Sequence, residues 1–423
     1  MALTSLTVDT NSSPGGPQPG AAQAMLWSVF ATAFTGLGAA LPVIIAAHVS
    51  TVEMVGQLGL ALAIAGPLMT LAGFSLRPVQ ITESDATYEV ATYAAARAGA
   101  GVVGVCCVAG VCVGSAPWIA VTAVLIAAAR GLEALSDVAH GHLQRENRMN
   151  LASLSVSVRV AAGLGLFWAG LRAGARLDVA AAGLVVGALI AIVTVDAPLV
   201  ATRALWRAVR AAHIRHVVRL ALPVAVAGFL AQVIWATPRF FLTGSELGVF
   251  TGLLQIPLVV VTLAGALSGG ALVSLKVAAA SATALRHRLL RSGGLVVAAV
   301  LAASGCLALL RREAVSIALG PAFAAHAGQL SVLLGVGVLE ACSGFIGVSL
   351  VSCGVHAGRG ALFMGGYAVG PLIVIAGCLG ARGDVTVDRA GWLLVCGAAA
   401  GLVVRAVLLA VVVRSRGSVG LGA

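Results

Sequence analysis

Long apolar stretches, each separated from the next by a short polar segment, occupy almost the whole chain. A helix needs about 20 apolar residues to cross a bilayer, and in lipid its backbone groups must pair within the helix itself. The pattern therefore predicts twelve membrane-spanning helices. They are expected at 26–47, 57–76, 95–114, 116–136, 151–171, 179–200, 217–242, 247–272, 293–310, 327–352, 361–380 and 390–413.

The composition agrees with this pattern. Hydrophobic residues make up 60% of the 423 residues, whereas charged residues make up 10%. A water-soluble fold of this length could not cover its surface with so few charges. The fold class predicted is an all-α polytopic membrane protein, and the spans leave no room for a large soluble domain.

The spans divide into two groups of six. Residues 1–24 are rich in Ser, Thr, Gly and Pro and lack the basic start of a signal peptide, so they are predicted to be a disordered cytoplasmic tail. The remaining units expected are an N-terminal six-helix bundle at 25–200, a basic cytoplasmic linker at 201–216, a C-terminal six-helix bundle at 217–413 and a cytoplasmic tail at 414–423.

Two pairs of short motifs indicate that the bundles are repeats. The second span carries Gly56-Gln-Leu-Gly59 and then Pro67, and the eighth carries Glu246-Leu-Gly248 and then Pro257. The fourth and tenth spans share the tripeptide Leu-Glu-Ala around Glu133 and Glu340. Because each half has an even number of spans, the repeats are expected to be parallel and to enclose a central cavity.

Positively charged residues lie mainly in the loops on one side of the predicted spans. The largest basic loop is 201–219, which holds five arginines. Cytoplasmic loops carry such an excess, so both termini are expected in the cytoplasm and the protein in the cell membrane. The net charge of +11 then reflects topology. No nucleic-acid partner is expected, because no basic segment is interleaved with aromatic residues.

Signatures of soluble enzymes are nearly absent. The GxGxxG pattern at 99–104 lies inside a span with no preceding strand, so it fails as a dinucleotide motif. The eight cysteines have no zinc or disulfide spacing. The chain is therefore expected to be no enzyme and to need neither cofactor nor metal. It also has no ATP-binding loop, so energy for transport would come from a gradient or a partner.

Polar stripes within the spans are the first candidates for a substrate cavity. Gln232, Trp235 and Arg239 follow one another at helical spacing in the seventh span, beside Pro238, and Gln255 lies in the eighth. Polar groups in membrane helices usually face the protein interior or water. The alternative is that Trp235 and Arg239 anchor the helix at the outer interface.

Glu340 is a candidate coupling residue because it lies near the middle of the tenth span. A carboxylate at that depth costs several kcal/mol unless it is paired, hydrated or protonated. It could bind a proton or cation, or contact the substrate. The alternative is a structural glutamate that is hydrogen-bonded within the bundle.

The remaining candidates are charged residues toward the cytoplasmic side. Glu133 and Asp137 lie one turn apart with Arg130 before them, and Arg130 is expected to pair with Glu133. This group is a candidate cytoplasmic gate or a plain solvated helix end. Arg159 and Arg405 lie inside spans and are candidate phosphate contacts, with snorkelling to the interface as the alternative.

The segment 56–97 resembles the oligosaccharide repeat-unit flippases of O-antigen and polysaccharide biosynthesis. The shared features are a glycine-led span with Pro67-Leu68, the pair Leu76-Arg77, and an acidic residue before a helix that bears Tyr93 and Arg97. A second similar block runs from Glu133 to Ser157. The resemblance covers roughly the first 170 residues. The near absence of lysine, apart from Lys276, departs from the family.

This resemblance implies a fold of the multidrug/oligosaccharidyl-lipid/polysaccharide exporter superfamily. It implies alternating access to a cationic cavity that holds a polyprenyl-linked glycan, with Arg77, Arg97, Arg159 and Arg405 as phosphate or sugar contacts. Polysaccharide polymerases and glycosyltransferases would then be partners. Proton or sodium coupling stays open.

Two other functions are weighed against the flippase. One is a cation-coupled exporter of drugs or other small molecules in the same superfamily, with Glu340 as the coupling acid. The other is a membrane-embedded transferase built around His140, His142 and Asp137, whose spacing fits no known motif.

We expect reporter fusions after residues 210 and 420 both to report a cytoplasmic location, because both positions follow basic segments. A reporter pair that is active in the cytoplasm and the periplasm, respectively, measures this directly. Periplasmic activity at either position would contradict the predicted topology.

Overall fold

The computed structural model describes residues 21–74, 76, 80, 90–146, 148–200, 209–279, 281–355, 359–381 and 385–419. Helix α1 (Ala21–Val49) begins within the segment predicted as a tail. The rest of that segment, residues 1–20, lies outside the described residues, as do 201–208 of the expected linker. At the other end, α17 (Val387–Val419) continues past Arg414, where a tail was predicted to begin.

The described residues contain twelve helices that are long and apolar enough to cross a membrane. One of them falls on each predicted span, so the expected multi-pass helical fold is confirmed. Besides α1 and α17, they are α2 (Val52–Ala72), α4 (Val90–Val111), α5 (Pro117–Arg145), α6 (Met149–Arg172), α7 (Leu177–Ala191), α9 (Ala211–Ala236), α10 (Gly244–Ala278), α11 (Ala282–Leu309), α14 (Ala327–Ser352) and α16 (Gly360–Gly380). A π-helical turn, η1 (Ile192–Asp196), and the short α8 (Ala197–Val200) extend α7.

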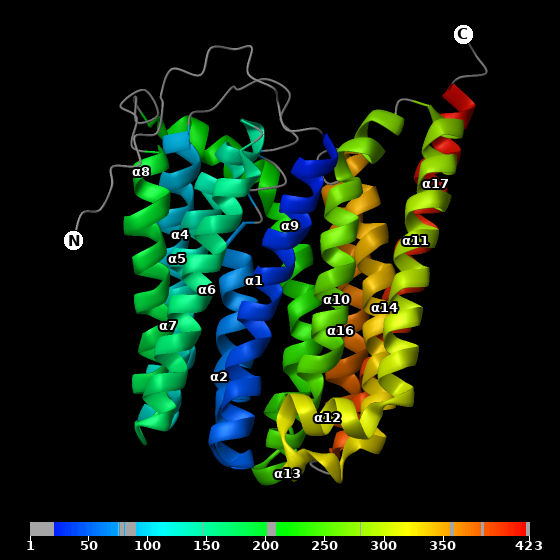
Figure 1. Cartoon of the computed structure of the whole chain (residues 1–423). Helices are drawn as coiled ribbons and strands as arrows, with labels where there is room; N and C mark the ends of the chain where they lie inside the picture. The colour runs from blue at the N-terminus through cyan, green and yellow to red at the C-terminus, as the bar shows by residue number, and fades with distance from the viewer. Residues whose placement is uncertain are drawn as a thin grey trace.

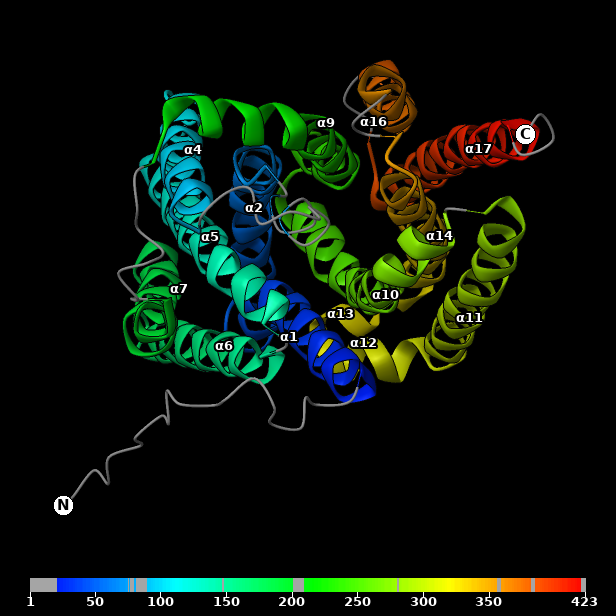
Figure 2. The same ribbon diagram turned by 90° about the horizontal axis from the view of Figure 1, so that it is seen from above.

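The helices form two lobes that stand side by side (Figure 1). In the N-lobe, α5 packs on α2, α4 and α7, and α6 packs on α1 and α7. In the C-lobe, α14 packs on α10, α11 and α17, and α16 packs on α9 and α17. Seen from above, α1, α2 and α10 lie near the centre between the two lobes (Figure 2). This arrangement agrees with two six-helix repeats.

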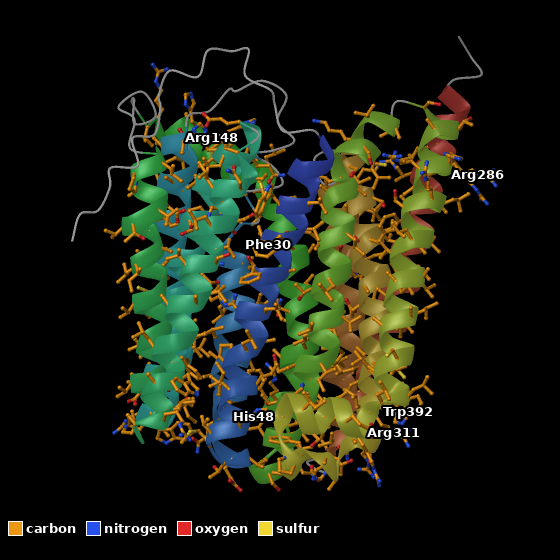
Figure 3. All side chains as sticks on the ribbon, viewed as in Figure 1. Phe30, His48, Arg148, Arg286, Arg311 and Trp392 are labelled. Carbon is orange, nitrogen blue, oxygen red and sulfur yellow. The ribbon has the colours of Figure 1, made fainter. Side chains whose placement is uncertain are left out.

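The two ends of the bundle are distinguished by where the first and last helices begin and end. Helix α1 begins and α17 ends at the same end, which we call the terminal end (Figure 1). Figure 3 shows Arg148 and Arg286 at this end, and His48, Arg311 and Trp392 at the opposite end. The chain therefore crosses an even number of times between its first and last helices.

The lobes meet where the two glycine motifs face each other. Helix α10 packs against α1 and α2. A Cβ added to Gly56 would lie 3.0 Å from the backbone nitrogen of Gly248, and one added to Gly248 would collide with the carbonyl oxygen of Val52. Gly59 likewise leaves room for the Thr251 side chain. Small residues allow such close approach. The motifs that mark the repeat therefore form a seam between the lobes, in the half away from the terminal end.

Several helices are longer than hydropathy predicts, and α5 and α11 extend furthest past one end of their predicted spans. α5 continues to Arg145, and α11 begins at Ala282, where the Ser281 hydroxyl accepts a hydrogen bond from the Ala284 amide. Hydropathy marks only the apolar part of a helix, whereas the hydrogen-bonded backbone continues into polar sequence until a residue ends it. As a consequence, Asp137 lies two turns before the end of α5 and not at the end of its span.

The segment between the ninth and tenth predicted spans is also helical. It forms α12 (Arg311–Leu319) and α13 (Pro321–Ala324), joined at Gly320, whose φ of +88° suits glycine. Val315, Leu319 and Phe323 are buried, and α12 packs on α14 and α1. The short helices cover the bundle at the end opposite the terminal end (Figure 1).

We expect Gly248→Ala to destabilise the protein by about 1–3 kcal/mol, because the added methyl group overpacks the seam. Gly265→Ala, on the same helix, is the matched control, since a Cβ there would meet no atom within 4 Å. Thermal unfolding of the detergent-purified variants measures the difference. Equal melting temperatures for the two variants would contradict the close contact described for the seam.

Candidate functional site: a charged cavity in each lobe

The N-lobe holds a cavity of about 340 Å³ in its half toward the terminal end. Five charged side chains from α4, α5 and α6 line it. The full lining is Thr35, Ala39, Gly66, Met69, Thr70, Gly73, Arg97, Arg130, Glu133, Ala134, Asp137, Arg159 and Gln232. The predicted gate residues on α5 and two of the predicted phosphate contacts therefore share one site, which we call the N-lobe cavity.

Glu133 lies between two arginines in this cavity. Arg130 Nη1 donates to Glu133 Oε2 at 3.0 Å, which confirms the expected pair. Arg159 Nε lies 4.0 Å from Glu133 Oε1, and it makes no hydrogen bond to the described residues. Arg159 is 5% exposed, so the snorkelling alternative is wrong for this residue. Glu133 thus lies between two guanidinium groups, and Asp137 is a second carboxylate in the same cavity.

Arg97 lies where the N-lobe cavity approaches the outer surface of the lobe. Its side chain passes over Gly73, where a Cβ would lie 3.0 Å from Arg97 Nη1. Arg97 also lines a groove of about 400 Å³ between α4 and α5. This α4–α5 groove is otherwise apolar, and it consists of Arg97, Ala98, Gly101, Val102, Val105, Cys106, Ala128, Gly131, Leu132 and Leu135.

The C-lobe has a cavity of about 400 Å³ whose charged centre is Glu340 and Arg405. Arg405 Nη2 lies 3.8 Å from Glu340 Oε1, and Arg405 Nε donates to the Gly401 carbonyl at 3.0 Å. The guanidinium carbon lies 4.3 Å from the centre of the Tyr367 ring, a cation–π distance. Arg405 is 2% exposed, so it does not snorkel to the interface.

The stripe predicted on the seventh span is divided by a proline. Gln232 lines both cavities, and Trp235 lines the C-lobe cavity. Pro238 lies in a 3₁₀ turn, η3 (Thr237–Phe240), that follows α9. The tighter turn takes Arg239 out of the stripe. Arg239 is buried outside the lining of both cavities, and its Nε has no hydrogen-bond partner among the described residues.

Two other predicted contacts are not placed in a cavity. Gln255 donates to the carbonyl oxygen of Thr251 on its own helix at 2.9 Å, and it lines neither cavity. This is the usual way a buried polar side chain is satisfied within a membrane helix. Arg77 lies outside the described residues.

The fold was compared with solved structures. A multidrug resistance MATE family transporter of the MOP superfamily, in an outward-facing conformation, matches with a TM-score of 0.69 and 15% identity over 96% of this chain and 98% of that one. A MATE structure in the straight conformation matches with a TM-score of 0.66 and 13% identity over 94% and 96%. The chain has the fold of the MATE transporters.

A further match with the MATE fold is a MOP superfamily transporter from Pyrococcus furiosus that is described as having a binding pocket of reverse polarity. Its TM-score is 0.63, with 14% identity over 95% of this chain and 97% of that one. No protein-family model matches the sequence, and no curated protein is significantly similar to it. At these identities the likeness establishes the fold.

Within this MATE fold, the two glutamates of the repeat are held differently. Glu133 on α5 pairs with arginines of α5 and α6, whereas Glu340 on α14 pairs with an arginine of α17. Tyr367 was not among the predicted site residues, because nothing in its spacing relates it to Arg405. Sequence analysis also did not pair Glu340 with Arg405, since only packing brings α14 and α17 together.

The histidines considered for a transferase do not converge. His140 faces Asp137 and Asp196, whereas His142 Nε2 lies 3.1 Å from Glu146 Oε1 near the end of α5. Residues two apart on a helix point in different directions. Among the described residues no three His, Cys, Asp or Glu side chains are arranged to hold a metal ion.

We expect Arg405→Met to lower stability by about 3–5 kcal/mol, because it leaves the Glu340 carboxylate buried without its cation. The double variant Glu340→Gln/Arg405→Met should lose less than the sum of the two single variants. Thermal unfolding in detergent measures all three, with Arg414→Met at an exposed position of α17 as the control. Additive losses would show that Glu340 and Arg405 do not interact.

Proposed function

We propose that the protein is an alternating-access transporter that exports an amphipathic organic solute. One observation carries this proposal: each lobe has a charged cavity, and Gln232 lines both of them. The cavities lie mainly toward the terminal end, whereas the glycine seam joins the lobes in the other half. A solute held between the lobes would be released on the other side when the lobes rock about the seam. The MATE fold supports this mechanism.

The charges of the cavities favour a solute with an anionic group. The N-lobe cavity carries Arg97, Arg130 and Arg159 against two carboxylates, Glu133 and Asp137. Guanidinium groups bind carboxylate, sulfonate or phosphate oxygens through forked hydrogen bonds. A solute without positive charge is therefore favoured over the organic cations expected for a multidrug exporter. The Pyrococcus furiosus transporter of reverse pocket polarity supports the idea that pocket charge varies within this fold.

The C-lobe cavity would receive the apolar part of such a solute. Its Glu340 and Arg405 offset each other, and Trp235, Phe363 and Tyr367 supply aromatic surface. Aromatic side chains bury a large area and contact apolar ligands well. The two cavities thus suit the two parts of an amphipathic molecule.

A lipid-linked oligosaccharide flippase is the second candidate, and the α4–α5 groove favours it. Arg97 lines both this apolar groove and the N-lobe cavity. A lipid with an anionic headgroup could place its chain in the groove and its phosphate at Arg97, and its sugars could enter the cavity. This arrangement corresponds to the flippase that the sequence resemblance implies.

Glu340 remains a proposed coupling residue for either function. It is 6% exposed, and its Oε1 makes no hydrogen bond to the described residues. A carboxylate in this setting can bind a proton or a cation when the lobes move. In this proposal an ion gradient drives export through Glu340.

Everted membrane vesicles distinguish the proposed solutes. We expect a fluorescent sulfonated anion to accumulate under an imposed proton or sodium gradient, and ethidium to accumulate less. Arg97→Gln together with Arg159→Gln should reduce anion uptake by about 10-fold or more, since a hydrogen bond to a charged group contributes about 1.5–3 kcal/mol. Arg148→Gln, outside the lining of both cavities, is the control.

Preferred uptake of ethidium would contradict the anionic solute. If neither dye moves, the same protein in liposomes with a fluorescent polyprenyl phosphate tests the second candidate. Loss of fluorescence on adding an impermeant reductant reports the lipid exposed in the outer leaflet. A faster change in this exposed fraction than in liposomes without the protein would favour the flippase.

A further inference from the structure

A histidine beside the N-lobe cavity lies between two carboxylates. His140 is 1% exposed. Its Nε2 lies 3.5 Å from Asp196 Oδ1, and its Nδ1 lies 3.7 Å from Asp137 Oδ1. Asp196 Oδ2 accepts a hydrogen bond from Ser136 Oγ at 2.6 Å. This His140 cluster links α5 to the end of α7, and the functions proposed above use Asp137 but neither His140 nor Asp196.

A π-helical turn places Asp196 in the cluster. Asp196 ends η1 and is 4% exposed, whereas Val193 in the same turn is 67% exposed. A π turn adds one residue to a helical turn and is found frequently at functional sites. Here the turn carries a carboxylate to the interior of the lobe, where it would be costly without a partner.

The two carboxylates of the cluster favour a protonated imidazole between them. A neutral imidazole has one N–H donor, whereas the imidazolium has two. Each ring nitrogen of His140 lies at ion-pair distance from a carboxylate oxygen, although neither makes a hydrogen bond to the described residues. If His140 is neutral, one nitrogen presents a lone pair to a carboxylate, which is repulsive. Proton loss would therefore weaken the hold of α5 on η1 and leave the two carboxylates without the cation between them.

The other groups that face the cluster do not replace this cation. Ser136 on α5 and Ser155 on α6 face Asp196 and offer only hydroxyl groups. Gln80 packs against Gly141 and donates to the Val138 carbonyl at 3.4 Å. The other charged groups that line the cavity with Asp137 are Arg97, Arg130, Glu133 and Arg159. Arg130, Glu133 and Arg159 form their own set of ion pairs, and Arg97 is also engaged in a contact. Among the described residues, His140 is the cationic partner recorded for Asp196.

Asp137 connects the His140 cluster to the N-lobe cavity. Its side chain is 40% exposed, and it lines the N-lobe cavity together with Arg97 and Arg159. Any change in the charge of His140 is therefore felt in the cavity through Asp137. Histidine is the side chain that exchanges its proton in the physiological pH range.

We propose that His140 is a proton-binding site that sets the charge of the N-lobe cavity. With a proton, His140 offsets Asp137 and Asp196, and the cavity keeps its excess of arginines. When the proton is lost, the net positive charge around the cavity falls by one unit, and the cavity binds an anionic solute less well. The consequence for solute binding rests on the proposed transport function, whereas the proton site itself does not.

The test uses the full chain with Ala134→Cys, a position that lines the N-lobe cavity one turn before Asp137. The detergent-purified protein is treated with a positively or a negatively charged methanethiosulfonate reagent between pH 5.5 and 8. Trypsin then releases the peptide 131–145, which contains no native cysteine, and mass spectrometry gives both rates. Their ratio cancels the ionisation of the thiol and reports the charge of the cavity.

We expect the ratio of the positive to the negative reagent to rise about 10-fold as the pH increases. A unit charge at roughly 6 Å, screened as in water, changes the rate of each reagent about threefold in opposite directions. His140→Gln should remove the step and leave the ratio high at every pH. His142→Gln, two residues away on the same helix and facing Glu146, should keep the step.

No step in the Ala134→Cys protein, or an unchanged step after His140→Gln, would overturn the proposal. If His140→Gln does not accumulate, His140→Asn serves the same purpose, and the parent protein alone still decides whether a step exists. Because the labelling needs no turnover, a step found in a protein that transports neither dye would leave the proton site in place and reject only the proposed transport.

Discussion

A charge inside a membrane-embedded bundle is stable only next to an opposite charge or water, and this requirement sets the orientation of the inner helices. Most helices of this protein are built from Ala, Gly, Val and Leu on every side, so hydrophobicity gives them little preference for one face. Arg159 on α6 faces Glu133 on α5, and Arg405 on α17 faces Glu340 on α14. The same pairs place the charges in cavities.

The sequence predicts the elements well, because membrane insertion depends on local composition. All twelve spans were found, and the pair Arg130 and Glu133 was expected because it lies within one helical turn. The ends of α5 and α11 were missed, since hydropathy does not detect a helix that continues into water. The α12 helix was missed for a similar reason: it is short and amphipathic, and it covers the end of the bundle without crossing it.

The contacts that make the site were beyond sequence analysis because they depend on tertiary packing. Glu340 and Arg405 belong to helices that meet only after the C-lobe has folded, and Tyr367 comes from a third helix. The stripe at Gln232 and Trp235 was predicted from periodicity and does face a cavity, but Pro238 ends that periodicity before Arg239. Asp196 lies inside the predicted span 179–200 and was not singled out. Its contact with His140 was beyond sequence analysis, because a π turn shifts it from the face that a regular helix would assign.

The two lobes share a fold, but their cavities differ in polarity. The N-lobe cavity has several charges, and the proposed proton site at His140 lies beside it, whereas the C-lobe cavity has one charge pair among aromatic side chains. A solute between them would meet a charged wall and an apolar wall at once. Movement of the lobes about the glycine seam would expose both walls to each side of the membrane in turn.

Pulsed electron–electron double resonance measures the distance between two spin labels, one in each lobe, and therefore tests this movement. In a cysteine-replaced background, one pair at Glu146 and Arg359 reports the terminal end, and one pair at Arg176 and Glu313 reports the opposite end. These positions are exposed and lie in different lobes. We expect two distance populations for each pair. The shorter distance at one end should accompany the longer distance at the other end. A single unchanged distance at both ends under every substrate and pH condition would contradict the proposed movement.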